Sequence, residues 1–411
     1  MNSDAVNADA VSPDLADAES SGPSAAARER RGLLIGFAAF GGFWGAWSAV
    51  LPDVRAQAGL QDGELGLALA AIAVAAVPAM PLAGRLVDRH GARRLIPAAM
   101  GLFAVVTVLP GLAKGLLPLV LALLLLGAIT GALDVLLNTA TASWERLERG
   151  RLMAGAHGCF SLGVLVASVA TGVARDLGAG PRTVLGASAC LLALAALSQP
   201  SYRSVPAEAP AAGRRRIAPL LLALGLLTAA AFLIEDAVQA WSALHLERTH
   251  DAPPWVGGLG PGLFAGAMAT GRFAVQGLGR AVSDARLVGG GGGVLAAGLV
   301  LLALGPSPAL VLLGAVIAGA GVSVLAPTLF SAVGSRSLPG QEGADLALVS
   351  ATGYLGFVLG PPLVGLISAA TTLPTALALL SVLAGAVAVT GPVALSRTRR
   401  TRPVRTGRLP A

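Results

Sequence analysis

Charged residues are scarce in this 411-residue sequence. Asp, Glu, Lys and Arg together make up 12% of the chain, against roughly 25% in soluble domains. Hydrophobic residues make up 55%, and the mean hydropathy is +0.75. A soluble domain needs more polar surface than this composition provides. The sequence therefore predicts a protein that lies in a lipid bilayer.

Lysine and cysteine are almost absent, which excludes several chemistries. The single lysine, Lys114, is followed by glycine, so the Gly-Lys-Ser/Thr step of a nucleotide-binding P-loop occurs nowhere, and we expect no ATP hydrolysis. Two cysteines, Cys159 and Cys190, are too few for a disulfide framework. Ser161 follows His157 by four residues, but Cys159 stands where a nucleophile elbow has glycine. We therefore expect no enzymatic activity, no cofactor and no metal site.

Long apolar stretches fill most of the chain. A helix needs about 20 apolar residues to cross a bilayer, and breaks at charge clusters, Pro and Gly divide the chain into twelve such stretches. The sequence therefore predicts an all-α membrane protein with twelve transmembrane helices. Their expected ranges are 32–52, 63–83, 95–113, 117–141, 153–174, 182–199, 217–244, 255–277, 287–305, 308–333, 345–370 and 373–395.

Positive charge lies mostly on one side of these spans. If the N-terminus is cytoplasmic, 24 of the 29 Lys and Arg residues fall in cytoplasmic segments. This bias is the positive-inside rule, so we expect a multi-pass protein of the inner (plasma) membrane with both termini in the cytoplasm. Topology also explains the net charge of +7, and we expect no nucleic-acid partner. The five basic residues left outside are Arg55, Lys114, Arg175, Arg182 and Arg248.

Three segments are polar enough to lie outside the bilayer. Residues 1–31 carry several acidic and few large apolar residues, which is typical of a disordered tail. Residues 200–216, rich in Pro, Ala and Arg, have the composition of a flexible linker. Residues 396–411 form a basic tail that suits an orientation and lipid-surface signal. We expect all three segments in the cytoplasm.

Short matches indicate an internal duplication. Ala-Trp-Ser-Ala occurs at 46–49 and again at 240–243, Gly-Arg at 84–85 and 271–272, and Leu-Gly at 162–163 and 355–356. The offsets are nearly equal, and each match joins corresponding helices of the two halves. Repeated halves are common in transporters. The sequence therefore predicts an N-terminal six-helix bundle over 32–199 and a C-terminal one over 217–395.

The segment between the second and third spans contains a motif. It resembles the loop pattern Gly-x-Leu-x-Asp-Arg-x-Gly-x-Arg-Arg of the major facilitator superfamily, with matches at Gly84, Leu86, Asp88, Arg89, Gly91, Arg93 and Arg94. The resemblance implies two pseudo-symmetric bundles, secondary transport by alternating access, and a loop that latches the cytoplasmic side.

By this resemblance, Asp88 faces the start of the eleventh span near Asp345. Glu145 and Glu148 are possible partners for the arginines of the motif. A short basic loop that only satisfies topology is the alternative, but it does not require an aspartate and two glycines at these spacings. The second-half counterpart, which begins at Gly271, lacks the aspartate.

Apart from Glu64 and Asp345 at the ends of predicted spans, three acidic residues fall within the spans, namely Asp134, Glu235 and Asp236. A charged carboxylate at the centre of a span costs about 2.5 to 3.5 kcal/mol, so such residues are usually functional. Glu235 and Asp236 are predicted near the outer face, where they serve either as a solvated helix end or as a coupling or substrate site.

Asp134 and His157 are expected in the cytoplasmic third of the fourth and fifth spans. Asn138 follows Asp134 by four residues and Ser161 follows His157 by four, so each pair shares one helix face. We expect these four residues to form one polar cluster. It either takes up and releases a proton during transport or pins the two helices as a neutral hydrogen-bonded network.

Trp44, Trp47 and Trp241 are candidates for stacking on a solute, with core packing or an interfacial belt as the alternative. The pattern of Asp134 with its three polar neighbours also resembles a poorly characterised bacterial branch near the fucose permeases.

Together these features predict a monomeric secondary transporter of a small solute, coupled to protons and leaning to efflux. The alternatives are a proton symporter or uniporter for a sugar-like or other small metabolite, and a membrane sensor that binds without translocating.

Overall fold

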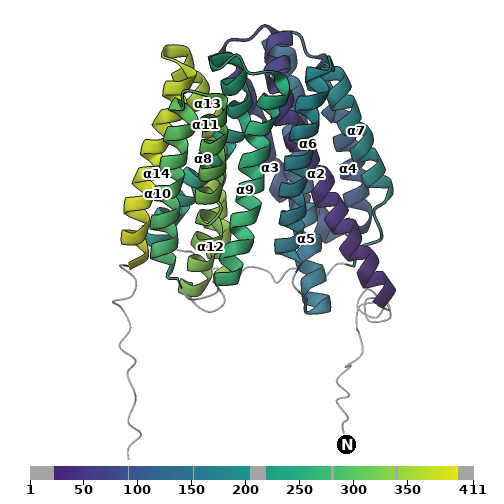
Figure 1. Ribbon diagram of the computed structural model, residues 1–411. Helices are drawn as coiled ribbons and strands as arrows, with labels where there is room; N and C mark the ends of the chain where they lie inside the picture. The colour runs from purple at the N-terminus through teal and green to yellow at the C-terminus, as the bar shows by residue number, and fades with distance from the viewer. Residues whose placement is uncertain are drawn as a thin grey trace, which may run out of the picture.

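The computed structural model describes residues 23–90, 92–150, 152–203, 219–278, 282–337 and 341–396, and all of its regular elements in these ranges are helices (Figure 1). The first half contains α2 Pro23–Ala58, α3 Asp62–His90, α4 Ala92–Thr107, η1 Leu109–Leu112, α5 Leu116–Glu148, α6 Met153–Asp176 and α7 Pro181–Leu197. The second half contains α8 Pro219–Thr249, α9 Pro254–Leu278, α10 Asp284–Leu304, α11 Pro308–Val322, α12 Leu325–Arg336, α13 Glu342–Ala370 and α14 Leu373–Ser396.

The twelve predicted spans are confirmed within the described ranges. Ten helical stretches are long and apolar enough to cross a bilayer, among them Pro308–Arg336, which unites α11 and α12. The shorter apolar helix α7 and the 25-residue α9 complete the set. Large apolar side chains such as Leu125, Leu194 and Val382 are exposed on the outside of the bundle, where lipid takes the place of water.

Several helix ends differ from the prediction. The first helix begins at Pro23, so residues 23–31 are helical and not part of a disordered tail, while residues 1–22 lie outside the described residues. Likewise, α8 continues to Thr249 and α5 to Glu148. These extensions carry polar side chains beyond the apolar stretch, which is why hydropathy alone made these three helices too short. Most of the linker, from 204, and the tail from 397 are also outside the described residues.

The two halves repeat the same helix pairs. In the first half α2 packs on α6, α3 on α5 and α4 on α7, and the matching pairs in the second are α8 on α13, α9 on α11 and α10 on α14. A Cβ atom on Gly163 of α6 would lie 2.3 Å from the Ala38 carbonyl oxygen, and one on Gly356 of α13 would lie 2.1 Å from that of Ala229. Small residues allow this approach of membrane helices, and the duplicated Leu-Gly matches mark the same contact twice.

The halves meet along two further pairs, α6 with α9 and α3 with α13. In Figure 1 α2 begins and α14 ends at the same end of the bundle. We call this the inner end, following the predicted orientation, and the opposite end the outer end.

The inner end of the first half is held by ion pairs. The Arg203 guanidinium donates to Glu29 on α2 at 2.7 Å and to Glu148 on α5 at 2.7 Å. The Oε1 atom of Glu145 accepts the backbone N–H groups of Leu152 and Met153 at the start of α6. Among the described side chains, neither Glu145 nor Glu148 pairs with a motif arginine. The Arg93 side chain lies outside the described residues, so its pairing with either carboxylate remains a prediction.

The predicted latch motif is mostly helical. Gly84, Leu86 and Arg89 lie on α3, which continues to His90, and Arg94 lies on α4. Gly84 lies within a helix, and a Cβ atom on it would meet nothing within 4 Å, so this glycine makes neither a turn nor a close approach to another helix. Gly91 and the side chains of Asp88 and Arg93 lie outside the described residues, and the latch remains a prediction.

Backbone contact between α3 and α5 yields a stability prediction. A Cβ atom on Gly127 would lie 2.1 Å from the carbonyl oxygen of Ile72. We expect Gly127→Val to lower the free energy of unfolding by about 1 to 3 kcal/mol, because the helices must move apart. Thermal unfolding in detergent, followed by tryptophan fluorescence, measures the loss. The matched control is Gly101→Val, where a Cβ meets nothing within 4 Å, and equal losses in both variants would contradict this packing.

Candidate functional site

Asp134, Asn138 and His157 form a connected polar chain between α5 and α6. The Nδ2 atom of Asn138 donates to Oδ1 of Asp134 at 3.1 Å and to its carbonyl oxygen at 2.9 Å. The Nε2 atom of His157 lies 3.2 Å from Oδ1 of Asn138. Asp134 is near the middle of the 33-residue α5 and not in the predicted cytoplasmic third, because the helix extends further at its inner end.

The second half adds a partner that sequence reasoning missed. The hydroxyl of Tyr354 on α13 donates to Oδ2 of Asp134 at 3.1 Å, so the Asp134 carboxylate bridges the two halves. Tyr354 could have been noticed as the only tyrosine in a predicted span. Ser161, by contrast, is buried and its Oγ atom has no hydrogen-bond partner in the described part of the chain. The predicted cluster therefore loses Ser161 and gains Tyr354.

Aromatic rings surround the polar chain on both sides. In the first half the rings of Phe37 and His157 meet edge to face, with centroids 5.1 Å apart. In the second half Phe232 stacks on Phe357 at 4.6 Å, and Tyr354 lies 5.6 Å from Phe357. These rings therefore flank His157 and Tyr354, the two outer members of the polar chain.

Glu235 and Asp236 lie deeper than predicted. Because α8 runs from Pro219 to Thr249, both residues are near its middle and not near the outer face. The Oε2 atom of Glu235 is 3.8 Å from Nη2 of Arg272. Arg272, which the sequence analysis counted as a cytoplasmic charge, lies on α9 six residues before its end and interacts electrostatically with His157 as well. Its position within the predicted span 255–277 was the signal for a role inside the bundle.

Two of the three candidate tryptophans, Trp47 and Trp241, lie in the hydrophobic core. Trp47 is buried and stacks on Phe43 at 6.4 Å, and Trp241 is completely buried in the second half. Trp44 is half-buried and contacts Phe43 edge to face at 5.3 Å. Core packing, the alternative reading of these residues, therefore replaces the predicted stacking on a solute for Trp47 and Trp241.

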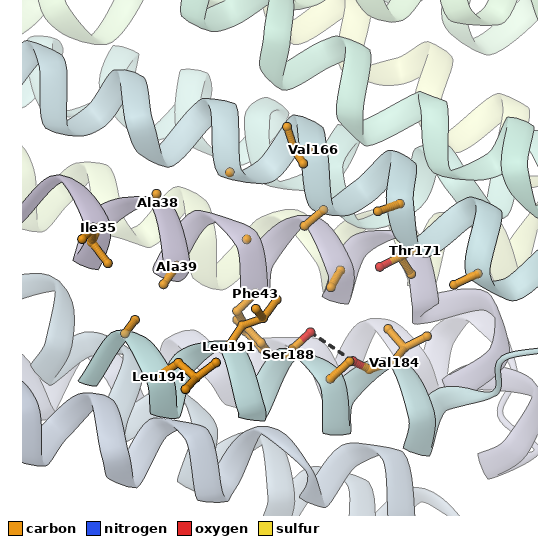
Figure 2. A pocket seen from close by; sticks show the side chains of 18 of the residues that line it. Ile35, Ala38, Ala39, Phe43, Val166, Thr171, Val184, Ser188, Leu191 and Leu194 are labelled. Atoms are coloured by element: carbon orange, nitrogen blue, oxygen red, sulfur yellow. Dashed lines mark hydrogen bonds between the residues drawn. The ribbon is translucent and has the colours of Figure 1, made fainter. Parts of the chain in front are cut away.

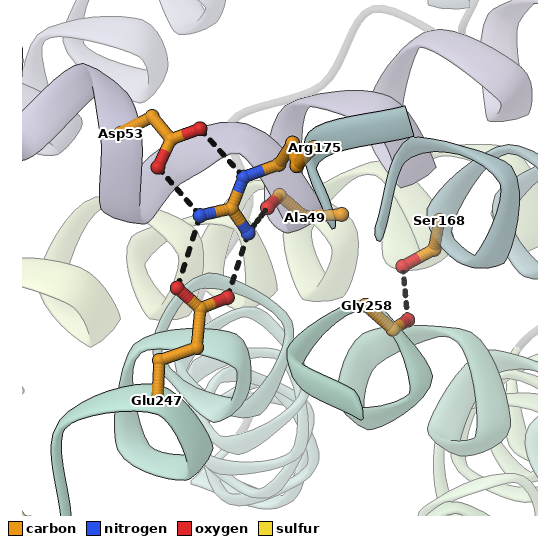
Figure 3. Close-up of polar contacts among 6 residues, drawn as sticks. All are labelled: Ala49, Asp53, Ser168, Arg175, Glu247 and Gly258. Atoms are coloured by element: carbon orange, nitrogen blue, oxygen red, sulfur yellow. Dashed lines mark hydrogen bonds and ion pairs between the residues drawn. The ribbon is translucent and has the colours of Figure 1, made fainter. Parts of the chain in front are cut away.

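Ion pairs close the outer end between the halves (Figure 3). Arg175 on α6, whose side chain is 1% exposed, donates to both carboxylate oxygens of Asp53 on α2 at 2.7 and 2.6 Å. It also donates to both oxygens of Glu247 on α8, at 2.6 and 2.9 Å, and to the Ala49 carbonyl at 2.7 Å. Bidentate pairs of this kind are the strong ones. One arginine thus joins a carboxylate of each half.

Asp62 forms a second set of polar contacts between the two halves at the outer end. Its Oδ1 atom pairs with Arg55 of the first half at 3.1 Å and with Arg248 of the second at 2.5 Å. Its Oδ2 atom accepts the hydroxyl of Ser368 on α13 at 2.6 Å. Sequence reasoning treated Arg55, Arg175 and Arg248 only as loop charges, because the partners of Arg175 and Arg248 in the other half are distant in the sequence.

A groove of about 650 Å³ lies between α2, α6 and α7 (Figure 2). None of the charged residues described above lines it. It is lined almost entirely by apolar side chains, among them Phe43 and Val184, and its Ser188 hydroxyl donates to the Val184 carbonyl at 3.1 Å. Val166, Leu191 and Leu194 at its rim are exposed to the lipid side. Lipid chains suit this groove better than a polar solute does.

Comparison with known proteins agrees with this architecture. The family model of the Major Facilitator Superfamily matches residues 32–337. The chain is 31% identical over 358 residues to an uncharacterized MFS-type transporter of Yersinia pestis, which covers 84% of this chain and 91% of the relative. It is also 31% identical over 360 residues to the membrane protein MosC of Rhizobium meliloti, which covers 87% of this chain and 88% of that protein.

Solved structures share the fold at low identity. A bacterial homolog of the human lysosomal transporter Spinster, in an inward-facing and unoccupied conformation, matches with a TM-score of 0.72 and 16% identity over 91% of this chain and 98% of that chain. The nucleoside transporter NupG matches with a TM-score of 0.69 and 13% identity over 89% of this chain and 98% of that chain. None of these matches supports a placement near the fucose permeases. The helix count, the duplicated bundles and the family match agree, and the chain belongs to the major facilitator superfamily, as a secondary transporter and not an enzyme.

Proposed function

We propose that this transporter exports a small solute in exchange for protons, with Asp134 as the coupling carboxylate. The observation that carries this proposal is the position of Asp134, which accepts hydrogen bonds from Asn138 of its own helix and from Tyr354 of the other half. The positive-inside bias supports a plasma-membrane orientation with both termini in the cytoplasm. Both halves of the site come from one chain, so a monomer suffices.

Protonation of Asp134 is expected to change the contact between the halves. A charged carboxylate accepts stronger hydrogen bonds than a neutral acid does. When Asp134 gains a proton, its tie to the Tyr354 hydroxyl weakens, and α5 and α13 are freer to separate. The proton thereby biases the relative position of the halves, which is what coupling to alternating access requires.

The ion pairs at the outer end control opening to the outside in the proposed alternating-access cycle. With Arg175 and Asp62 bridging the halves, the site is closed from the outer side. Opening to that side requires that Arg175 separate from Glu247 and that Asp62 separate from Arg248 and Ser368. Because each partner retains another ion pair or remains near the outer surface, these contacts can break and form again.

Replacement of Asp134 tests the coupling. Asn keeps the size of the side chain and an acceptor for Tyr354 but cannot bind the transported proton. In inside-out vesicles with an acid interior, we expect a panel of amino acids, amines and sugars to include solutes that release protons from the wild type, as dequenching of a pH probe. Asp134→Asn should lose this solute-dependent signal entirely.

The matched control is Asp284→Asn, which removes a carboxylate at the start of α10 that pairs with Arg336 at 3.2 Å. It should keep the signal. A proton signal that survives in Asp134→Asn would rule out Asp134 as the coupling group, and a wild type that takes up solute without moving protons would rule out antiport.

Replacement of Arg175 tests the outer closure. Arg175→Gln leaves Asp53 and Glu247 as like charges across the interface, and removal of one partner from a buried ion pair costs about 3 to 5 kcal/mol. We expect the outer end to open. The reporter is Ser168→Cys in a chain with both native cysteines replaced by serine, because Ser168 is fully buried and donates to the Gly258 carbonyl across the interface at 2.7 Å.

A membrane-impermeant maleimide added from the outside should label this cysteine about tenfold faster or more in Arg175→Gln. The exposed Arg182→Gln at the start of α7 is the control and should leave the labelling rate unchanged. Equal rates in both variants would show that Arg175 does not hold the outer end closed.

A further inference from the structure

Arg272 lies inside the bundle without hydrogen bonds. A guanidinium carries five N–H donors, and in the described part of the chain none of those of Arg272 has an acceptor within hydrogen-bond distance. The contact to Glu235 is 3.8 Å long, and the Nε atom is buried without a partner. A buried donor without an acceptor on a charged group in a membrane span is costly. The Nε atom of Arg272 therefore needs an acceptor that the described residues do not supply.

Asp236 is an acceptor that lacks a donor among the described residues, whereas Arg272 is a donor that lacks an acceptor. Among the described residues, no donor or cation lies within hydrogen-bond or ion-pair distance of its carboxylate, and the charged group that it interacts with is Glu235, of the same sign. Asp236 is half-buried near the middle of α8. A cationic group is the partner that this carboxylate lacks.

Both residues are partly exposed and lie close to each other. The Arg272 side chain is 26% exposed and Asp236 is half-buried, although the outer end is closed. Asp236 directly follows Glu235, whose carboxylate is 3.8 Å from Arg272. Phe232 precedes Asp236 by four residues and so lies on the same face of α8. Phe232 stacks on Phe357, which in turn lies 5.6 Å from Tyr354, the partner of Asp134.

We propose that Arg272 and Asp236 bind the two charged ends of a zwitterionic, amino-acid-like solute. The solute carboxylate accepts two parallel hydrogen bonds from the Arg272 guanidinium. The solute ammonium group forms an ion pair with Asp236. The apolar part of the solute lies against Phe232 and Phe357. This inference rests on the proposed function, because it names the class of solute that the transporter carries.

Other charge classes fit less well. A solute with only a carboxylate would face Glu235 and Asp236 with no cation of its own, and like charges in a desolvated site are rejected. A solute with only an amine would leave the Arg272 donors unfilled. The zwitterion satisfies both groups at once, and Glu235 remains as the counter-charge that holds Arg272 in place when the site is free.

The test compares three molecules that share a phenylethyl body, namely L-phenylalanine, 2-phenylethylamine and 3-phenylpropionate. Binding to the purified full-length protein is measured as the increase in thermal unfolding temperature, without a proton gradient. We expect L-phenylalanine to stabilise the wild type at millimolar concentrations and at least about tenfold more tightly than either singly charged analogue. Equal or tighter binding of the amine or the acid, or no stabilisation by the zwitterion, would overturn the proposal.

Two variants test which residue binds the carboxylate of the solute and which binds its ammonium group. Arg272→Lys keeps the charge and should bind L-phenylalanine about tenfold more weakly, because the fork is lost. Asp236→Asn should also weaken L-phenylalanine but strengthen 3-phenylpropionate, because a like charge is removed, and this opposite response is not expected of a merely destabilised protein. A uniform loss for all ligands in Asp236→Asn would contradict the assignment.

Two further variants separate this inference from the proposed proton coupling. Asp284→Asn, the matched control outside the site, should bind like the wild type. Asp134→Asn should still bind L-phenylalanine even though it no longer moves protons. Binding without proton movement in the wild type would refute the coupling and leave the solute class standing, whereas proton movement driven by singly charged solutes alone would refute the solute class.

Discussion

The shortage of polar partners inside a bilayer is the constraint on which this structure depends. A helix satisfies its own backbone groups, but a polar side chain in a span must find a partner on another helix or a ligand. Most polar side chains of the described residues do so locally, as when Thr141 and Thr228 donate to the carbonyls four residues earlier. Several of the others form contacts between the two halves, among them Asp134, Arg175 and Asp62.

Contacts within each half differ from those between the halves in how many polar groups they include. Within each half, α6 and α13 approach α2 and α8 so closely that a single methyl group would not fit at Gly163 or Gly356, which favours bundles that move as units. Between the halves at the outer end, backbones also approach closely, since a Cβ atom on Gly365 of α13 would lie 2.4 Å from the carbonyl oxygen of Asp62 on α3. The ion pairs and hydrogen bonds of Arg175 and Asp62 are added to these contacts. Ion pairs and hydrogen bonds can exchange their partners for water when the halves separate.

Features that are local in the sequence could be predicted, and those that join distant segments could not. The twelve spans follow from runs of apolar residues, and the chain from Asp134 to Asn138 and His157 follows from helical spacing on two consecutive helices. The tie from Asp134 to Tyr354 joins residues 220 positions apart, and that from Arg175 to Glu247 joins residues 72 apart. Without the fold, a basic residue near a span end is indistinguishable from a topological signal, which is why Arg175 and Arg248 were assigned to loops. Arg272 was counted with the cytoplasmic charges although it falls within the predicted span 255–277.

His157 connects the two unusual sets of polar groups. On one side it contacts Asn138, which holds Asp134, and on the other it lies within electrostatic range of Arg272. A proton on Asp134 changes the charge at one end of this series, and a carboxylate bound to Arg272 changes it at the other. The groups interact through hydrogen bonds of 3.1 and 3.2 Å on one side of His157 and electrostatically on the other, in a low-dielectric interior. In the proposed mechanism, proton and solute binding are therefore linked through His157 without direct contact between them, and by the reciprocity of linkage each changes the affinity for the other by the same factor.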